Sequence, residues 1–167
     1  ASILQLPDET NAGISSISRQ NYNPNIPDTI HMRVVDDLRK KGVMVRVLLN
    51  KPVMLDVMLR AVSGRQVADL VEDLRTLAKN IIWLNLSDNS LTDNQLDVLQ
   101  EMVNLEKLRL EKNPVSDGIV DYLHGLQHLE AVNLNETKIS PAGLRKLREN
   151  PSIKRVYTWK TLCDTLN

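Results

Sequence analysis

One 24-residue pattern recurs through the second half of this 167-residue chain and constrains its fold more than any other feature. Successive copies begin with an apolar residue at the same interval, at Ile81, Leu105, Leu129 and Ile153. Self-similarity at a fixed period of this size is the sequence signature of a solenoid, in which each copy stacks on the one before it. We therefore expect a stack of similar coils that share a single elongated core.

The first half of each copy is predicted to be a short strand with one buried face. Its apolar residues follow the spacing L-x-x-L-x-L, and the last two alternate with polar neighbours. A short side chain with an acceptor oxygen then follows at one fixed offset. These residues are Asn89, Asn113, Thr137 and Thr161. Stacked side chains of this kind can bond the backbone of the turn that leaves the sheet, so we expect a polar ladder here.

The second half of each copy is predicted to be a helix with a repeated start signal. The expected N-cap residues are Thr92, Ser116 and Ser140, and the first repeat is expected to start its helix at Ser63. The residues that follow the three regular caps suit the first helical turn. They are Asp93, Asp117 and Pro141. Apolar residues before each cap and four positions into each helix complete a hydrophobic staple. A strand, a turn and a helix within this length fit one coil of a horseshoe.

The residues before the first repeat are predicted to form a cap over the open end of the stack. Asp28 is the expected N-cap of a helix over 30–41, which Gly42 ends. Two β-rich runs, 43–49 and 53–59, are separated by only three residues, a connection that suits antiparallel strands. The second run is the strand of the first repeat, and the first run covers its edge together with the helix. Terminal units of repeat proteins are atypical in this way because one of their faces meets water.

These patterns predict an arm followed by one repeat domain. Residues 1–27 contain scattered Asn, Ser and Pro without a sustained period, and they read as an extended arm or linker. The repeat domain is predicted to cover 28–167. Its parts are an N-terminal cap at 28–52, a first repeat at 53–80, regular repeats at 81–104, 105–128 and 129–152, and a terminal partial repeat at 153–167.

The repeated residues resemble the leucine-rich repeat family over 81–161. The second regular copy matches its pattern at Leu105, Leu108, Leu110, Asn113, Val115, Gly118, Val120 and Leu123. The resemblance implies an α/β fold, a leucine-rich repeat solenoid that winds as a right-handed βα horseshoe. It places a short parallel sheet on the concave side and helices on the convex side, next to the N-terminal helix and antiparallel-strand cap.

A second, looser resemblance rests mainly on residues 134–161. The wording N-E-T-K-I-S-P-A-G-L-R-K-L, followed by Y-T-W-K-T, is similar to bacterial repeats that form the C-terminal tails of membrane-anchored proteins like c-type cytochromes. It implies an extracytoplasmic, periplasmic location and a larger parent chain, with haem elsewhere in that parent. No cofactor is expected in these residues, because the only cysteine, Cys163, cannot form a C-x-x-C-H haem attachment site.

Strand geometry predicts a candidate protein-binding face. If Leu84 and Leu86 point into the core, their neighbours point onto the open face of the sheet. The candidate residues are Met58, Arg60, Trp83, Asn85, Lys107, Arg109, Glu111, Asn133, Asn135, Arg155, Tyr157 and Trp159. Trp, Tyr and Arg are the residue types that most often supply binding energy at interfaces. The alternative is that Trp83 and Trp159 only cover the neighbouring sheet or the terminal coil.

Catalytic and metal-binding interpretations have little support in the sequence. His124 and His128 lie four residues apart near Asp121, but a third ligand at a suitable spacing is missing and a solvated helix edge explains them better. The repeated serines stand at cap positions, without a histidine placed to activate them. We expect no metal site, no cofactor and no enzymatic activity.

The composition narrows the class of partner. The 21 acidic and 21 basic residues balance, which gives no reason to expect nucleic acid as a partner. No run of about 18 apolar residues occurs, so we expect no direct insertion of this stretch into a membrane. The sequence therefore predicts a non-catalytic protein-interaction module, with another protein of unknown identity as its partner. The alternative is a passive spacer or cap without a ligand of its own.

Overall fold

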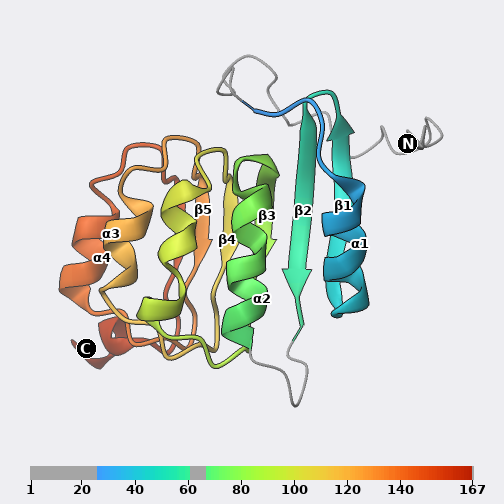
Figure 1. Ribbon diagram of the computed structural model, residues 1–167. Helices are drawn as coiled ribbons and strands as arrows, with labels where there is room; N and C mark the ends of the chain where they lie inside the picture. Colours follow the sequence, from blue (N-terminus) through green and yellow to red (C-terminus); the bar gives the residue numbers. More distant parts are fainter. Residues whose placement is uncertain (1–25, 61–66, 167) are drawn as a thin grey trace.

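The computed structural model describes residues 26–60 and 67–166, and its strands form one six-stranded sheet (Figure 1). The strands lie side by side in chain order. They are β1 (Val43–Asn50), β2 (Val53–Leu59), β3 (Ile81–Asn85), β4 (Lys107–Arg109), β5 (Ala131–Asn133) and β6 (Arg155–Tyr157). β1 pairs with β2 antiparallel, and every later pair is parallel. The predicted cap strand and parallel stack are therefore confirmed.

The helices cover one face of this sheet (Figure 1). The α-helices are α1 (Met32–Lys40), α2 (Val67–Asp73), α3 (Ile119–Leu123) and α4 (Pro141–Leu147). Segments of 3₁₀-helix lie at Leu74–Asn80, Asp93–Gln95, Asp97–Glu101 and Leu162–Leu166. Among the described residues, no helix covers the opposite face, which we call the open sheet face.

One elongated core fills the space between the sheet and the helices. It runs from Val35 on α1 to Leu147 on α4, and the strand pairing aligns one apolar residue from each coil within it. A smaller second cluster contains Ile26, Leu48, Met54 and Ile82. Met54 alternates with the core residue Leu55 along β2, so this second cluster lies on the open sheet face near β1 and β2.

The start of α1 differs from the sequence prediction. The helix begins at Met32 with His31 as its N-cap residue, so the prediction of Asp28 as the cap is wrong. The carbonyl of Pro27 accepts a hydrogen bond from Asn80 Nδ2 at 3.2 Å, which fixes the preceding chain against the first repeat before the helix can begin. Gly42, with φ of 92°, follows the helix as predicted.

The helical halves of the regular repeats are shorter than predicted. In the repeat at 81–104 they are two 3₁₀ segments instead of an α-helix, and α3 begins after Gly118 instead of Ser116. The tighter 3₁₀ winding suits short connectors, and each coil here has few residues with which to return to the sheet. Ser140 caps its helix as predicted, because its Oγ accepts from the Gly143 N–H. Thr92 is also an N-cap residue as predicted, although the segment that it begins is 3₁₀, and the Gln95 side chain accepts from its N–H at 2.9 Å. The helix start predicted at Ser63 and most of the arm predicted at 1–27 lie outside the described residues.

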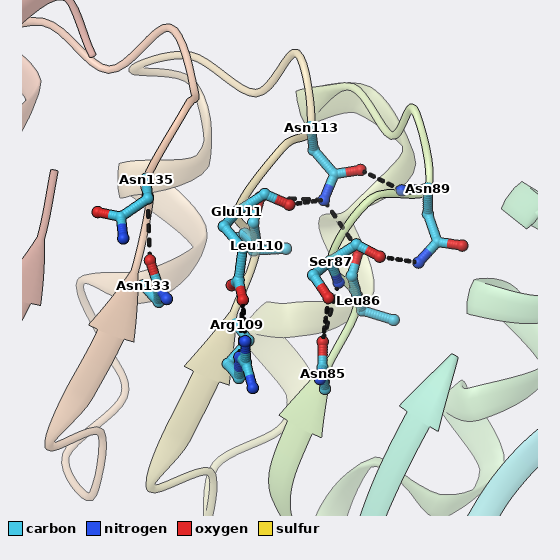
Figure 2. A network of polar contacts seen from close by, with 10 residues as sticks. All are labelled: Asn85, Leu86, Ser87, Asn89, Arg109, Leu110, Glu111, Asn113, Asn133 and Asn135. Atoms are coloured by element: carbon cyan, nitrogen blue, oxygen red, sulfur yellow. Dashed lines mark hydrogen bonds and ion pairs between the residues drawn. The ribbon is translucent and has the colours of Figure 1, made fainter. Parts of the chain in front are cut away.

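The polar ladder is confirmed and bridges neighbouring coils (Figure 2). Asn113 donates from Nδ2 to the carbonyls of Leu86 and Leu110 at 2.9 and 3.0 Å. Its Oδ1 accepts from the backbone N–H groups of Asn89 and Leu91 at 3.1 and 2.9 Å. All four bonds satisfy buried backbone groups where the chain leaves the sheet. The Thr137 hydroxyl, at the same position, donates to the Leu134 carbonyl of its own coil at 2.7 Å and to no other group in the described part of the chain.

A second polar ladder joins the helical sides of the coils. The Asp93 carboxylate accepts from the backbone N–H of Ser116 at 2.7 Å and from its hydroxyl. Asp117 accepts in the same way from Ser140, with the backbone bond at 2.8 Å. We predicted these acids to stabilise helix ends, and the structure uses them to connect one coil to the next. The fixed offset between each acid and the next serine was the available signal.

Gly143 is the more crowded of two glycines at which this second ladder leaves little room for a side chain. A Cβ built there would meet the Asp117 carboxylate and would lie 2.9 Å from Ile139 Cδ1. We predict that Gly143→Ala lowers the free energy of unfolding by roughly 1–3 kcal/mol, the usual cost of overpacking. Urea unfolding would measure this loss. The matched control is Gly125→Ala, because no heavy atom lies within 4 Å of a Cβ built there. An equal loss in both variants would contradict the prediction.

Candidate functional site: the open sheet face

The strand register places the predicted face residues in rows. One row joins Asp56, Trp83, Lys107, Ala131 and Arg155, and the next joins Met58, Asn85, Arg109, Asn133 and Tyr157. A third row consists of Arg60, Ser87, Glu111, Asn135 and Trp159. It lies just past the strand ends, where backbone bonds continue the stacking. Lys112 N–H donates to the Asn135 carbonyl at 3.0 Å, and Glu136 N–H donates to the Trp159 carbonyl at 2.8 Å.

The aromatic residues of the open sheet face differ in exposure. Tyr157 and Trp159 are 50% and 59% exposed, and Lys160 Nζ lies 4.3 Å from the centre of a Trp159 ring. Trp83 is half-buried because it packs against the second apolar cluster. Its Nε1 also donates to Glu106 Oε2 at 3.4 Å, while Lys107 Nζ lies 4.0 Å above its ring. Trp83 therefore covers the neighbouring sheet, whereas Trp159 presents a large apolar surface to solvent.

Arg109 and Glu111 form an ion pair in the middle of the open sheet face (Figure 2). Arg109 Nε donates to Glu111 Oε1 at 2.8 Å. Glu111 is only 8% exposed, and its Oε2 has no hydrogen-bond partner among the described residues. The Arg109 guanidinium thus neutralises a carboxylate that is almost buried. The sequence pattern predicted both residues on this face, but it did not indicate that the Arg109 guanidinium covers the Glu111 carboxylate.

Three asparagines of the open sheet face use their side-chain oxygens internally, and Figure 2 shows these bonds for two of them, Asn85 and Asn133. Asn85 Oδ1 accepts from the Ser87 N–H at 3.0 Å, and Asn133 Oδ1 accepts from the Asn135 N–H at 3.0 Å. Asn135 Oδ1 accepts from the Trp159 N–H at 2.8 Å. A backbone N–H needs an acceptor, so these bonds fix which end of each amide faces the protein. The three NH₂ groups point away from these backbone N–H groups, and none of them donates a hydrogen bond to another group within the described residues.

The helical side carries ion pairs between coils. Arg75 pairs with Glu72, Asp97 and Glu101, and the hydrogen bond with Glu72 is the main reason that the pKa of Arg75 is raised. The same Arg75 bond lowers the pKa of Glu72. A groove of about 430 Å³ lies beside this cluster, between α1 and the first-repeat helix. The repeat pattern did not indicate this cluster, since its members come from two different coils.

Asp121 on α3 and Lys146 on α4 give a pH-dependent test of coil stacking. Lys146 Nζ donates to Asp121 Oδ1 at 2.5 Å, and this bond lowers the pKa of Asp121. A carboxyl with a lowered folded-state pKa stabilises the fold above its unfolded pKa, and the contribution is lost as pH falls through the folded value. We predict that Lys146→Met returns the pKa of Asp121 toward about 3.9, the ordinary value. Carboxyl-detected NMR titration would check this, and an unchanged pKa would contradict the pairing.

The residues considered for metal binding lie apart from the open sheet face. His124 is exposed at the end of α3, and His128 lies in the loop before β5. Among the described residues, no group of three or more His, Cys, Asp or Glu side chains is placed to hold a metal ion. Cys163 is half-buried and its Sγ donates to the Ile139 carbonyl at 3.7 Å. None of the helices in the described ranges is long and apolar enough to cross a bilayer.

Comparisons with known proteins add one structural similarity. The chain matches no protein-family model and no curated protein. The solved structures that it matches include an internalin from Listeria monocytogenes, with 21% sequence identity and a TM-score of 0.45. That match covers 77% of this chain and 42% of the internalin, so the chain spans less than half of that protein's length.

The geometry of the chain itself identifies its fold. Parallel strands recur once per coil in chain order, a leucine-rich core aligns behind them, and a ladder of Asn and Thr side chains bonds the turns that leave the sheet. The α/β fold of this chain is a leucine-rich repeat solenoid with an N-terminal helix and antiparallel-strand cap.

Proposed function

We propose that this chain is a non-catalytic protein-interaction module that binds another protein through its open sheet face. The supporting observation is the exposure of Tyr157 and Trp159, which lie side by side in neighbouring rows of that face. Large aromatic side chains are rarely left exposed together without a role, and they are the residue types that supply most binding energy at interfaces.

The polar groups of the face support binding over catalysis. The Ser87 hydroxyl on this face donates to Asn85 Oδ1 at 2.7 Å, and the Glu111 carboxylate accepts a hydrogen bond from Arg109. Neither arrangement pairs a nucleophile with a base that could activate it. The rows instead form a rigid surface, because each residue is fixed by strand pairing to the next coil.

A passive spacer is the alternative, and the structure has one observation in its favour. Trp83 packs against an apolar cluster of the cap, so one of the two tryptophans on this face has a structural task. Trp159 has no comparable cluster beneath it among the described residues. The difference between these two tryptophans therefore favours the binding module for the part of the face near β5 and β6.

We also propose that the module belongs to a larger bacterial membrane protein similar to c-type cytochromes and lies outside the cytoplasm. This part of the proposal rests only on the resemblance of residues 134–161. The sequence of the gene upstream of Ala1 tests it. A C-x-x-C-H motif and membrane spans in the same reading frame would support this parent, and their absence would remove it without affecting the binding module.

The binding proposal is tested by affinity capture from the source cells with matched variants. The face variant combines Arg109→Ala, Tyr157→Ala and Trp159→Ala, and the control combines the exposed helix-side changes Arg33→Ala, His124→Ala and Arg148→Ala. We expect the wild type and the control to retain the same protein, and the face variant to lose it. Retention by the face variant, with unchanged circular dichroism for all three proteins, would contradict the proposal.

A further inference from the structure

We propose that the open sheet face recognises an acidic segment of its partner protein, one that presents Asp or Glu carboxylates. This inference rests on the proposed function and adds the chemistry of the partner. Two independent features support it: the charges left unpaired on the face, and the direction of its free hydrogen-bonding groups.

The unpaired charges of the face are all positive. Its two acids already have partners, since Arg46 holds Asp56 at 2.7 Å and Arg109 covers Glu111. The remaining charged residues of the rows are Arg60, Lys107 and Arg155. None of these three has a carboxylate within ion-pair distance among the described residues. The open sheet face therefore carries a local excess of positive charge, although the whole chain has equal numbers of acidic and basic residues.

The free polar groups of the face are hydrogen-bond donors. Asn85, Asn133 and Asn135 turn their oxygens toward backbone N–H groups and leave their NH₂ ends without a bonding partner within the described residues. The one acceptor in the middle of the face, Glu111, is buried and covered by a guanidinium. A ligand that satisfies these donors must itself be rich in acceptors, and a carboxylate accepts from several N–H groups at once.

The exposed aromatics favour a protein segment as the source of these carboxylates. Tyr157 lies beside Asn133 in one row, and Arg155 and Trp159 stand two residues before and after Tyr157 along the chain, so a segment that reaches the donors also covers the aromatic rings. The turns that border the face alternate in charge, from Asp88 and Lys112 to Glu136 and Lys160, so they add no net charge of their own. Anionic lipid or nucleic acid would be attracted to the same cations and is an outcome of the test.

Selection from a random peptide library on the immobilised protein tests this inference. We expect enriched peptides rich in Asp and Glu, whose affinity falls at least about tenfold when Lys107→Glu and Arg155→Glu are combined. Their affinity should also fall with rising salt. The control combines Arg33→Glu and Arg148→Glu, two exposed helix-side residues without an ion pair in the described part of the chain, and should bind as the wild type does.

The outcomes separate this inference from the proposed function. Neutral or basic peptides whose binding is lost in the Tyr157→Ala/Trp159→Ala variant would overturn the acidic partner and keep the binding face. Peptides that bind this aromatic variant normally would overturn both. Tight binding of anionic vesicles or single-stranded nucleic acid, without enrichment of acidic peptides, would also overturn the proposal of an acidic protein segment.

Discussion

Replacing Asn113 with alanine is expected to lower the free energy of unfolding by roughly 3–5 kcal/mol, because a buried hydrogen-bond network loses its centre. The side chain is 1% exposed and bonds five backbone groups in two coils. Alanine would remove the partner that these groups have in the Asn113 side chain, which is itself buried. Chemical unfolding followed by circular dichroism would measure the loss.

Two matched variants make this prediction specific to the ladder. Asn113→Thr copies the residue found naturally at Thr137 and keeps a hydroxyl that can bond the carbonyl within its own coil, so we expect a smaller loss. Asn133→Ala removes an asparagine from the same region that is only half-buried and bonds one backbone N–H, and it should cost about 1 kcal/mol. Equal losses in all three variants would contradict a ladder that links coils.

Leu110→Ala is expected to lower the free energy of unfolding by roughly 2–5 kcal/mol. Leu110 is fully buried, and its counterparts in the neighbouring coils, Leu86 and Leu134, are equally buried. Removing its side chain opens a cavity with a coil on each side, and neither coil can collapse into it without breaking strand pairs. Urea unfolding gives the loss, and an unchanged m-value would show that the variant still unfolds as one unit.

The control for Leu110 lies in the terminal coil. Val156 aligns with Leu108 and Val132 in the sheet but is only half-buried, because no further coil covers it among the described residues. We expect Val156→Ala to lower the free energy of unfolding by clearly less than Leu110→Ala does. The difference should exceed what the smaller size of the valine side chain explains. A similar loss of unfolding free energy at both positions would contradict a stack whose middle coils contribute more to stability than its terminal coil.

The repeat made the sheet predictable, because aligning the copies with one another identifies the corresponding residues of every coil. The spacing of Leu84, Leu108 and Val132 determines which residues share a row, and the structure pairs these same residues. The position of Asn113 in the pattern likewise predicted a buried side chain that bonds the turn. These features depend on interactions that recur identically in each coil, so they appear in the sequence as periodicity.

Features that depend on contacts between unlike positions were not predictable. Asp93 reads as a first-turn acid within its own coil, and only the stacked neighbour shows that it binds Ser116. For Trp83 the sequence left two alternatives, a binding residue or a cover for the neighbouring sheet, and the structure favours the second because Ile26 from before α1 joins the cluster on which Trp83 packs. The exposed NH₂ donors of the face were not predictable for the same reason. The direction of the Asn135 amide, for example, is set by the Trp159 N–H of the next coil.

The measurement that tests the central claim most directly is an NMR titration of isotope-labelled protein with a peptide selected on it. If the open sheet face is the binding surface, the largest amide shifts will cluster at Arg109, Asn133, Arg155, Tyr157 and Trp159. The helices α1 to α4 should shift little, because the core separates them from that face. Shifts that cluster instead around Arg75 and the groove beside α1 would contradict the account.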